Sequence, residues 1–449
     1  MKKILSLLIA AILLLTLAAC NAGDGSGLPK VGDKVEGFVV KETRDFPLVG
    51  AKLIYMEHEK TGAGLVYIAN NDTNRVFNLT FFTRAIDNTG LPHIFEHSTL
   101  DGSEKYPSKA LFFNLSYQTY NTYMNAMTSQ LYTTYPVASL SEEQLLKYAD
   151  FYTDSCLHPI ILDDESIFRE EAWRYRLADM DSELTIEGTV YSEMLGATSI
   201  NSEAYRNMLR SAFPGATVCN VSGGAPESIP DMTWESLRSY HDLYYHPSNC
   251  CAFLYGEFED YTAFLKLLNE AFSPYEKREF SFEEKDYTAI TDDVVNNWKF
   301  PAETNTSTEN ASIVYYAIMC PGLKDNPEEE LVYNTLTDLL NASGSTLMQN
   351  LKRAIPRGSF GSYIELDGPE DMIVFIAMNI NESDASTFRE TVDSSLAEIA
   401  QTGFSDDLVD AVMNSVAMSV KLTGESSDIG VDLIDTFVSY YAARGLVFG

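Results

Sequence analysis

Residues 90–107 of the chain read GLPHIFEHSTLDGSEKYP, and the pentapeptide HIFEH at 93–97 is the sharpest feature of the sequence. Pro92 suits the first turn of a helix, because the N–H that proline lacks has no partner there. On a helix, His93 and His97 stand one turn apart on the same face. We therefore predict a helix that begins near Pro92 and presents both imidazoles to one point.

This spacing indicates a metal site with a nearby base. Two imidazoles at i and i+4 can bind one Zn²⁺, each at about 2.0–2.1 Å. Glu96 shares their face and can take a proton from a water without being a ligand itself. The order H-x-x-E-H is the inverted form of the zincin motif. The competing interpretation is a helix with two unrelated histidines, but the chain has only six histidines, so we favour the metal site.

The residues alone leave the third metal ligand open. A catalytic zinc needs three protein ligands and one open position. Glu193 is attractive because it lies in a predicted helix beside apolar Met194 and Leu195, where a carboxylate needs a charge partner. Many other acidic residues are candidates, and so are the four remaining histidines, which are His58, His158, His241 and His246.

Composition sets the broad class. The chain has 449 residues, of which 45% are hydrophobic, so it is long enough for two domains that each bury a core. A formal net charge of −34 argues against nucleic acid as a partner, because such binding needs a basic face. Six cysteines without a CxxC pair predict neither a disulfide scaffold nor a thiolate metal site.

The first twenty residues resemble an export signal. Lys2 and Lys3 precede an apolar run over 4–17, which is shorter than the roughly 20 residues that span a bilayer. The run ends in Leu-Ala-Ala-Cys at 17–20, which resembles a bacterial lipobox, whose cysteine is lipidated. We predict a signal peptide over 1–19, lipidation of Cys20, a flexible tether over 20–29, and a membrane-anchored lipoprotein outside the cytoplasm. The alternative is an ordinary signal peptide that happens to contain Cys20.

The hydrophobic periodicity predicts an α+β fold of two related domains, each an antiparallel sheet backed by helices. A polar, charged stretch at 276–297 is the expected linker, between a first domain over 30–275 and a second over 298–449. The first domain has predicted strands at 35–40, 52–57, 64–68, 76–83, 123–128, 131–137 and 250–255, and helices at 108–117, 141–157, 166–177, 185–195, 232–245 and 261–272. The second has predicted strands at 312–319, 360–364 and 372–377, and helices at 328–340, 386–400 and 406–417.

The stretch at 90–107 closely resembles the active-site segment of the pitrilysin/insulinase metallopeptidases, nearest to the presequence proteases. The likeness runs from about residue 30 to the C-terminus and implies one half of a pitrilysin-like clamshell. Five further segments are similar and follow in the expected order: Tyr123–Thr128, Tyr135–Ser139, Phe168–Arg174, Ser222–Asp231 and Tyr244–Asn249.

The resemblance implies roles for individual residues. His93 and His97 become zinc ligands, and Glu96 becomes the general base. The family's third ligand falls on Glu193, although its Asn-Glu-Met-Lys-Gly segment here reads Ser-Glu-Met-Leu-Gly. Asn125 and Ala126 are implied to lie on the edge strand that pairs with an extended peptide, a mode that tolerates many sequences.

Two residues near these segments receive structural interpretations instead. Glu187 is expected to be a surface glutamate rather than the partner of a histidine. His246 is expected to cap or pack.

The resemblance also implies what surrounds the chain. Family members of this type work as two halves, and the second half brings an Arg and a Tyr that stabilise the oxyanion. This sequence matches the first half and ends within the second domain. The expected partners are peptide substrates, the membrane through Cys20, and a separate C-terminal-half subunit or a second copy; a truncated gene is the other explanation.

The predicted function is that of a zinc-dependent endopeptidase, or its catalytic half, which cleaves short or unfolded peptides. The alternative is a non-catalytic or partner-dependent peptide-binding lipoprotein. Glu96 argues against that alternative, because binding alone needs no general base.

Overall fold

The structure is a computed structural model that describes residues 27–109, 111–281, 287–300 and 307–444. The predicted signal peptide and Cys20 lie outside these residues. The chain divides into two compact units. The first contains the described parts of Met1–Leu195, Val221–Phe282 and Thr423–Gly449, and the second those of Gly196–Asn220 and Glu283–Leu422.

The first unit is built on a nine-stranded sheet in the order β1-β2-β3-β4-β11-β5-β8-β6, with β7 also paired to β8. Its strands are β1 (Lys34–Val35), β2 (Phe38–Phe46), β3 (Ala51–His58), β4 (Gly64–Ala69), β5 (Arg75–Phe81), β6 (Tyr123–Met124), β7 (Met127–Thr128), β8 (Thr133–Ser139) and β11 (Cys250–Gly256). We predicted an antiparallel sheet, but this sheet is mixed. Strand β11 inserts between β4 and β5, which run in opposite directions, so it must be parallel to one of them, and that one is β4.

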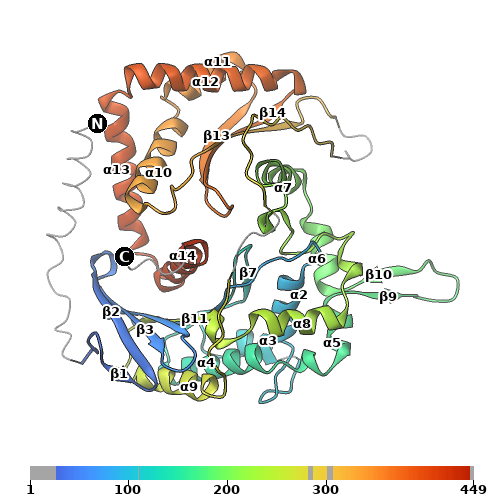
Figure 1. Cartoon of the computed structure of the whole chain (residues 1–449), viewed down its shortest axis with the longest axis vertical. Helices are drawn as coiled ribbons and strands as arrows, with labels where there is room; N and C mark the ends of the chain where they lie inside the picture. The colour runs from blue at the N-terminus through green and yellow to red at the C-terminus, as the bar shows by residue number, and fades with distance from the viewer. Residues whose placement is uncertain (1–26, 110, 282–286, 301–306, 445–449) are drawn as a thin grey trace. The chain divides into compact units, whose positions relative to one another are not determined.

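Helices cover both faces of this sheet (Figure 1). One face packs against α2 (Leu91–Thr99), α4 (Glu142–Leu157), α8 (Trp234–Tyr244) and α9 (Thr262–Phe272). The other face packs against α14 (Ile429–Arg444), through Ile434 and Val438. The last helix therefore belongs to the first unit, not to the second domain as the expected boundary at 298–449 implied, because its apolar residues cover strand residues such as Val76 and Tyr255.

The elements between β8 and α8 differ in part from the prediction. They include α5 (Glu165–Glu171), β9 (Arg174–Arg176), β10 (Thr185–Glu187) and α6 (Thr189–Ala197), and α3 (Leu111–Gln118) precedes β6. The predicted helix over 166–177 ends at Glu171, because residues 174–176 pair with 185–187 as an antiparallel hairpin.

The second unit has a three-stranded antiparallel sheet, ordered β12 (Ser312–Met319), β14 (Met372–Ile380), β13 (Ser359–Glu365). One face packs against α10 (Pro327–Asn341), α11 (Thr346–Ala354) and α12 (Ala385–Thr402). The other packs against α7 (Ile200–Ala212), which the predicted boundary had assigned to the first domain. Helix α13 (Asp406–Thr423) completes the fold, which confirms the predicted α+β class with helix-backed sheets.

In the described ranges, six short 3₁₀ turns link these elements, at Pro47–Val49, Ile160–Leu162, Thr217–Cys219, Ile229–Asp231, Pro247–Asn249 and Glu382–Asp384. Within the described residues, no helix is both long enough and apolar enough to cross a membrane.

Candidate metal centre

Helix α2 is positioned by a close backbone approach and by its buried face. Gly90 caps its N-terminus with a φ of 81°, and the Ile94 N–H donates to the Gly90 carbonyl at 2.9 Å. Ile94 and Phe95 are fully buried in the core beneath the sheet. This burial leaves His93 and His97 on the opposite, partly exposed side of the helix.

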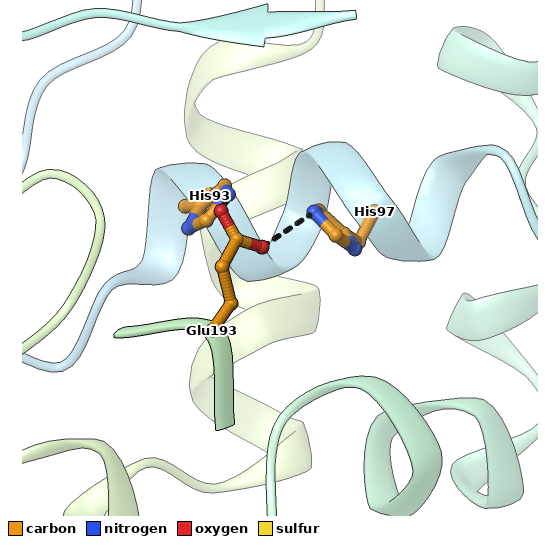
Figure 2. Close-up of side chains that lie close together, drawn as sticks. All are labelled: His93, His97 and Glu193. Carbon is orange, nitrogen blue, oxygen red and sulfur yellow. Dashed lines mark ion pairs between the residues drawn. The ribbon is translucent and has the colours of Figure 1, made fainter. Parts of the chain in front are cut away.

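The structure brings His93 and His97 together with Glu193, which comes from α6 (Figure 2). Nε2 of His93 lies 3.7 Å from Oε1 of Glu193, and Nε2 of His97 lies 3.6 Å from Oε2. Ligands of one tetrahedral zinc stand about 3.3 Å apart when each bond is about 2.0–2.1 Å. Two imidazoles and a carboxylate in this arrangement therefore fit a zinc ion.

The second nitrogen of each ring is also occupied. Nδ1 of His93 lies 3.2 Å from the Gly223 carbonyl, and Nδ1 of His97 lies 3.1 Å from Oε2 of Glu171. Both partners accept hydrogen bonds, so each Nδ1 carries the proton and donates it. Each Nε2 then has its lone pair directed towards Glu193, which is the tautomer that a metal ligand needs.

The pKa of His97 reflects this environment. Burial alone lowers it, but the hydrogen bond to Glu171 and the charges of Glu96, Glu171 and Glu193 outweigh burial, and the pKa is raised.

Glu171 is the residue that sequence reasoning missed. It lies at the end of α5 within a segment that resembled the family, but Glu170 stands beside it, and the sequence does not say which of the two faces α2. Glu187, in contrast, forms ion pairs with Arg174 and Arg176 and contacts neither histidine of α2.

Glu96 precedes His97 on α2 and is 6% exposed. Its Oε2 accepts a hydrogen bond from the Thr128 hydroxyl at 2.6 Å, while Oε1 has no hydrogen-bond partner among the described residues. Burial raises the pKa of this carboxyl, against the opposing effects of Thr128 and the two histidines. A raised pKa makes a carboxylate a better proton acceptor near neutral pH.

Asn125 and Ala126 lie between β6 and β7, at the edge of the sheet. The Asn125 N–H donates to the Pro136 carbonyl at 3.2 Å, and the Asn125 carbonyl accepts from the Tyr152 hydroxyl at 2.8 Å. Both main-chain groups of Asn125 are thus used inside the protein. Those of Ala126 have no hydrogen-bond partner in the described part of the chain.

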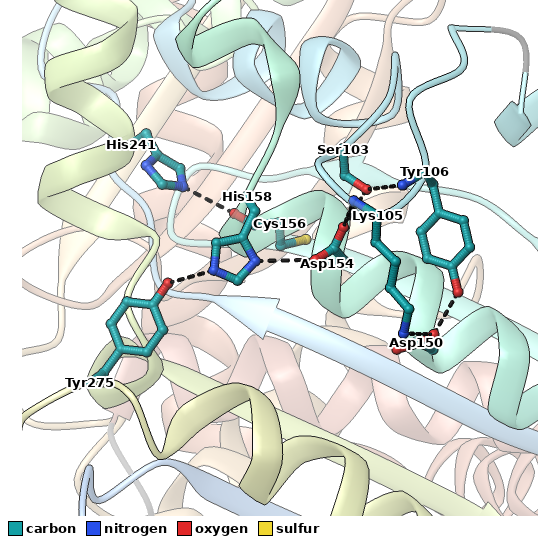
Figure 3. A network of polar contacts seen from close by, with 9 residues as sticks. All are labelled: Ser103, Lys105, Tyr106, Asp150, Asp154, Cys156, His158, His241 and Tyr275. Carbon is teal, nitrogen blue, oxygen red and sulfur yellow. Dashed lines mark hydrogen bonds and ion pairs between the residues drawn. The ribbon is translucent and has the colours of Figure 1, made fainter.

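The loop after α2 is fastened to α4 by a polar network (Figure 3). Ser103 donates to Asp154 at 2.5 Å, and Tyr106 donates to Asp150 at 2.5 Å. The other oxygen of Asp154 lies 3.1 Å from Nδ1 of His158. The network is structural, and it fixes the segment that leaves the C-terminal end of α2.

The other histidines that the sequence left as candidate ligands lie elsewhere. His58 contacts Thr61 and Asn269, His241 contacts the Cys156 carbonyl, and His246 accepts from the Ser248 N–H as a cap. Among the described residues, His93, His97 and Glu193 form the single group of three or more side chains with metal-ligand spacing.

Comparisons with known proteins agree with this geometry. Residues 85–211, which include His93, Glu96, His97 and Glu193, match a family model described as insulinase (peptidase family M16). Residues 231–416 match one described as peptidase M16 inactive domain.

Curated relatives match most of the chain. A mitochondrial presequence protease of Mus musculus is 30% identical over 92% of this chain and 40% of its own length. Protein HypA of Clostridium perfringens is 31% identical over 86% of this chain and 40% of its own length. The chain thus spans about two fifths of the length of these relatives.

Solved structures share the fold at low identity. Pitrilysin aligns with a TM-score of 0.61 at 14% identity, over 93% of this chain and 43% of its own. A protease from Helicobacter pylori aligns with a TM-score of 0.60 at 15% identity, over 86% of this chain and 88% of its own. From the two family models, the curated relatives and the shared fold, we conclude that the chain belongs to the M16 (insulinase/pitrilysin) peptidase family.

Proposed function

We propose that this chain is the zinc-binding, catalytic part of an endopeptidase that cleaves short or unfolded peptides. The observation that carries the proposal is the meeting of two imidazole Nε2 atoms and the Glu193 carboxylate beside the buried Glu96. A bound zinc supplies Lewis-acid chemistry, which polarises a carbonyl and lowers the pKa of water to about 7.

The chain's own residues supply orientation and proton transfer. Gly223 and Glu171 hold the rings of His93 and His97 in the ligand tautomer. Glu96 has one oxygen held by Thr128 and the other without a partner, so Oε1 is the atom that takes a proton from the attacking water. A carboxylate in this role typically contributes about 10²–10⁴-fold to the rate.

The substrate is proposed to bind as an added strand. The unpartnered N–H and carbonyl of Ala126 lie at the sheet edge, next to the strand that carries Thr128. Main-chain pairing of this kind recognises an extended backbone rather than particular side chains. It therefore suits peptides that are short or unfolded.

Two parts of the proposal rest on the sequence and the relatives. Because the chain spans about 40% of the relatives' length, a separate C-terminal-half subunit or a second copy is proposed to supply the groups that stabilise the oxyanion. The lipobox-like segment ending at Cys20 supports attachment to a membrane outside the cytoplasm.

Zinc titration of the metal-free full chain tests the site. We expect one tightly bound zinc per chain, and loss of that binding in His93→Gln and in Glu193→Gln. His158→Gln is the matched control, since His158 contacts the carboxylate of Asp154 but lies outside the site. This variant should bind zinc as the wild type does. Zinc binding that survives both ligand substitutions contradicts the proposal.

A further inference from the structure

The strand beside the site makes one side-chain contact with the proposed base. The Thr128 hydroxyl donates to Oε2 of Glu96 at 2.6 Å, the short distance of a charge-assisted hydrogen bond. It is the single hydrogen bond to the Glu96 carboxylate among the described residues.

Thr128 is itself held firmly. It lies in β7 and pairs with Thr133 of β8 in the ladder. In the turn that precedes Thr128, the Asn125 carbonyl accepts a hydrogen bond from the Tyr152 hydroxyl. Tyr152 is fully buried, so this contact holds the turn in place. A β-branched residue in a strand has few χ1 rotamers, so the position of the hydroxyl is set by the sheet.

The two carboxylate oxygens of Glu96 therefore have different surroundings. Oε2 is fixed by Thr128, and Oε1 is left without a protein partner. A freely rotating carboxylate would spend part of its time with neither oxygen directed at the reacting water. Proton transfer needs the base within about 2.6–3.2 Å of the proton's donor, so a fixed orientation raises the fraction of productive encounters.

We propose that Thr128 is a positioning residue, whose hydroxyl holds Oε2 of Glu96 so that Oε1 faces the water to be deprotonated. The inference rests on the proposed function. Ala126, whose main chain is proposed to pair with the peptide, is two residues from Thr128 on the same segment. The strand that receives the peptide is thus the strand that holds the base.

The test compares kinetics of the zinc-loaded full chain on a quenched fluorescent peptide. Thr128→Val keeps the shape and removes the hydroxyl, whereas Thr128→Ser keeps the hydroxyl. Thr122→Val is the matched control, because Thr122 precedes β6 and its hydroxyl bonds Asn74, away from the site. We expect kcat of Thr128→Val to fall about 10- to 100-fold, a part of the whole general-base contribution, with KM and zinc content unchanged. Thr128→Ser and Thr122→Val should stay within about threefold of the wild type, because both keep the hydroxyl on Glu96.

Three kinetic results would overturn the inference: an unchanged kcat in Thr128→Val, a loss confined to KM, or a serine variant as impaired as the valine variant. A crystal structure of zinc-loaded Thr128→Val gives a readout that does not depend on activity. There we expect the Glu96 carboxylate to rotate or to occupy more than one conformer, and an unmoved carboxylate refutes the positioning role. If the proposed function is wrong, the wild-type chain will show no cleavage that is lost on substitution of Glu96. That result is distinct from the three above.

Discussion

At the scale of single residues, the two histidines of α2 differ in what holds them. His93 donates to a carbonyl, whereas His97 donates to the carboxylate of Glu171. A carboxylate fixes the ring and increases the basicity of the ligand nitrogen more strongly than a carbonyl does. Glu171 also accepts from the Thr189 hydroxyl at the start of α6, so it links the two helices that carry the candidate metal-binding side chains.

We therefore expect Glu171→Gln to weaken zinc affinity by about 10- to 100-fold without unfolding the chain. Glu170→Gln is the matched control, since Glu170 is an exposed neighbour that pairs with Lys109. Competition with a chelator measures both affinities. Equal affinities for the two variants would show that the contact with His97 has no role in zinc binding.

A pair of histidines away from the site predicts the pH dependence of stability. Burial lowers the pKa of His241 to about 4, below the value of about 6.5 for an unfolded chain. The folded state thus prefers the neutral ring, and its stability is complete above pH 6.5 and falls as pH drops towards 4. His158 has the opposite sign, because its hydrogen bond to Asp154 raises its pKa, so its contribution is present below pH 6.5 and is lost as pH rises.

His241→Gln should remove up to about 3 kcal/mol of the acid-induced loss in unfolding free energy, because glutamine can donate to the Cys156 carbonyl without titrating. His158→Gln should instead lower stability at acid pH. Urea unfolding at pH 7.0 and at pH 4.5 measures both. An unaltered pH dependence in His241→Gln means that the ring titrates normally in the folded chain.

At the scale of elements, the approach of two backbones sets the position of α2. A Cβ at Gly90 would lie 2.6 Å from the Gly224 Cα and 2.8 Å from the Gly223 carbonyl oxygen, and φ is positive there. That carbonyl is the acceptor for His93. The start of the helix and the orientation of its first histidine therefore depend on the same contact.

Gly90→Ala should destabilise the chain by about 2 kcal/mol or more, since strain and overlap with rigid backbone add together, and it should weaken zinc binding. Gly196→Ala in α6 is the control, because a Cβ there meets nothing within 4 Å and alanine favours a helix by up to about 1 kcal/mol. Thermal unfolding compares the two, and a harmless Gly90→Ala would contradict this explanation of the geometry.

Many of the helices and strands were predictable from the local sequence pattern, and those that were not share a cause. Periodicity predicted α4 and α9 within a residue or so, and Pro92 marked the first turn of α2. Periodicity extended α5 too far, because β9 pairs with a strand nine or more residues away. The histidine pair and Glu96 were predictable from spacing, whereas Glu171 was not, since only the packing of α5 on α2 decides which glutamate faces inward.

At the scale of the whole molecule, chain order and spatial order differ. The last helix, α14, packs on the sheet of the first unit, whereas α7 packs on the sheet of the second unit. A prediction from the sequence places domain boundaries where the composition changes. Composition carries no information about which hydrophobic core an amphipathic helix joins. The candidate metal-binding residues nevertheless all lie in the first unit.

The claim that this unit is a working peptidase is tested most directly by cleavage of a quenched fluorescent, unstructured peptide. The zinc-loaded full chain should hydrolyse it, and Glu96→Gln should reduce the rate by about 10²–10⁴-fold while its zinc content stays equal to that of the wild type. Hydrolysis at equal rates by the two proteins would contradict the assignment of Glu96 as the base of a peptidase.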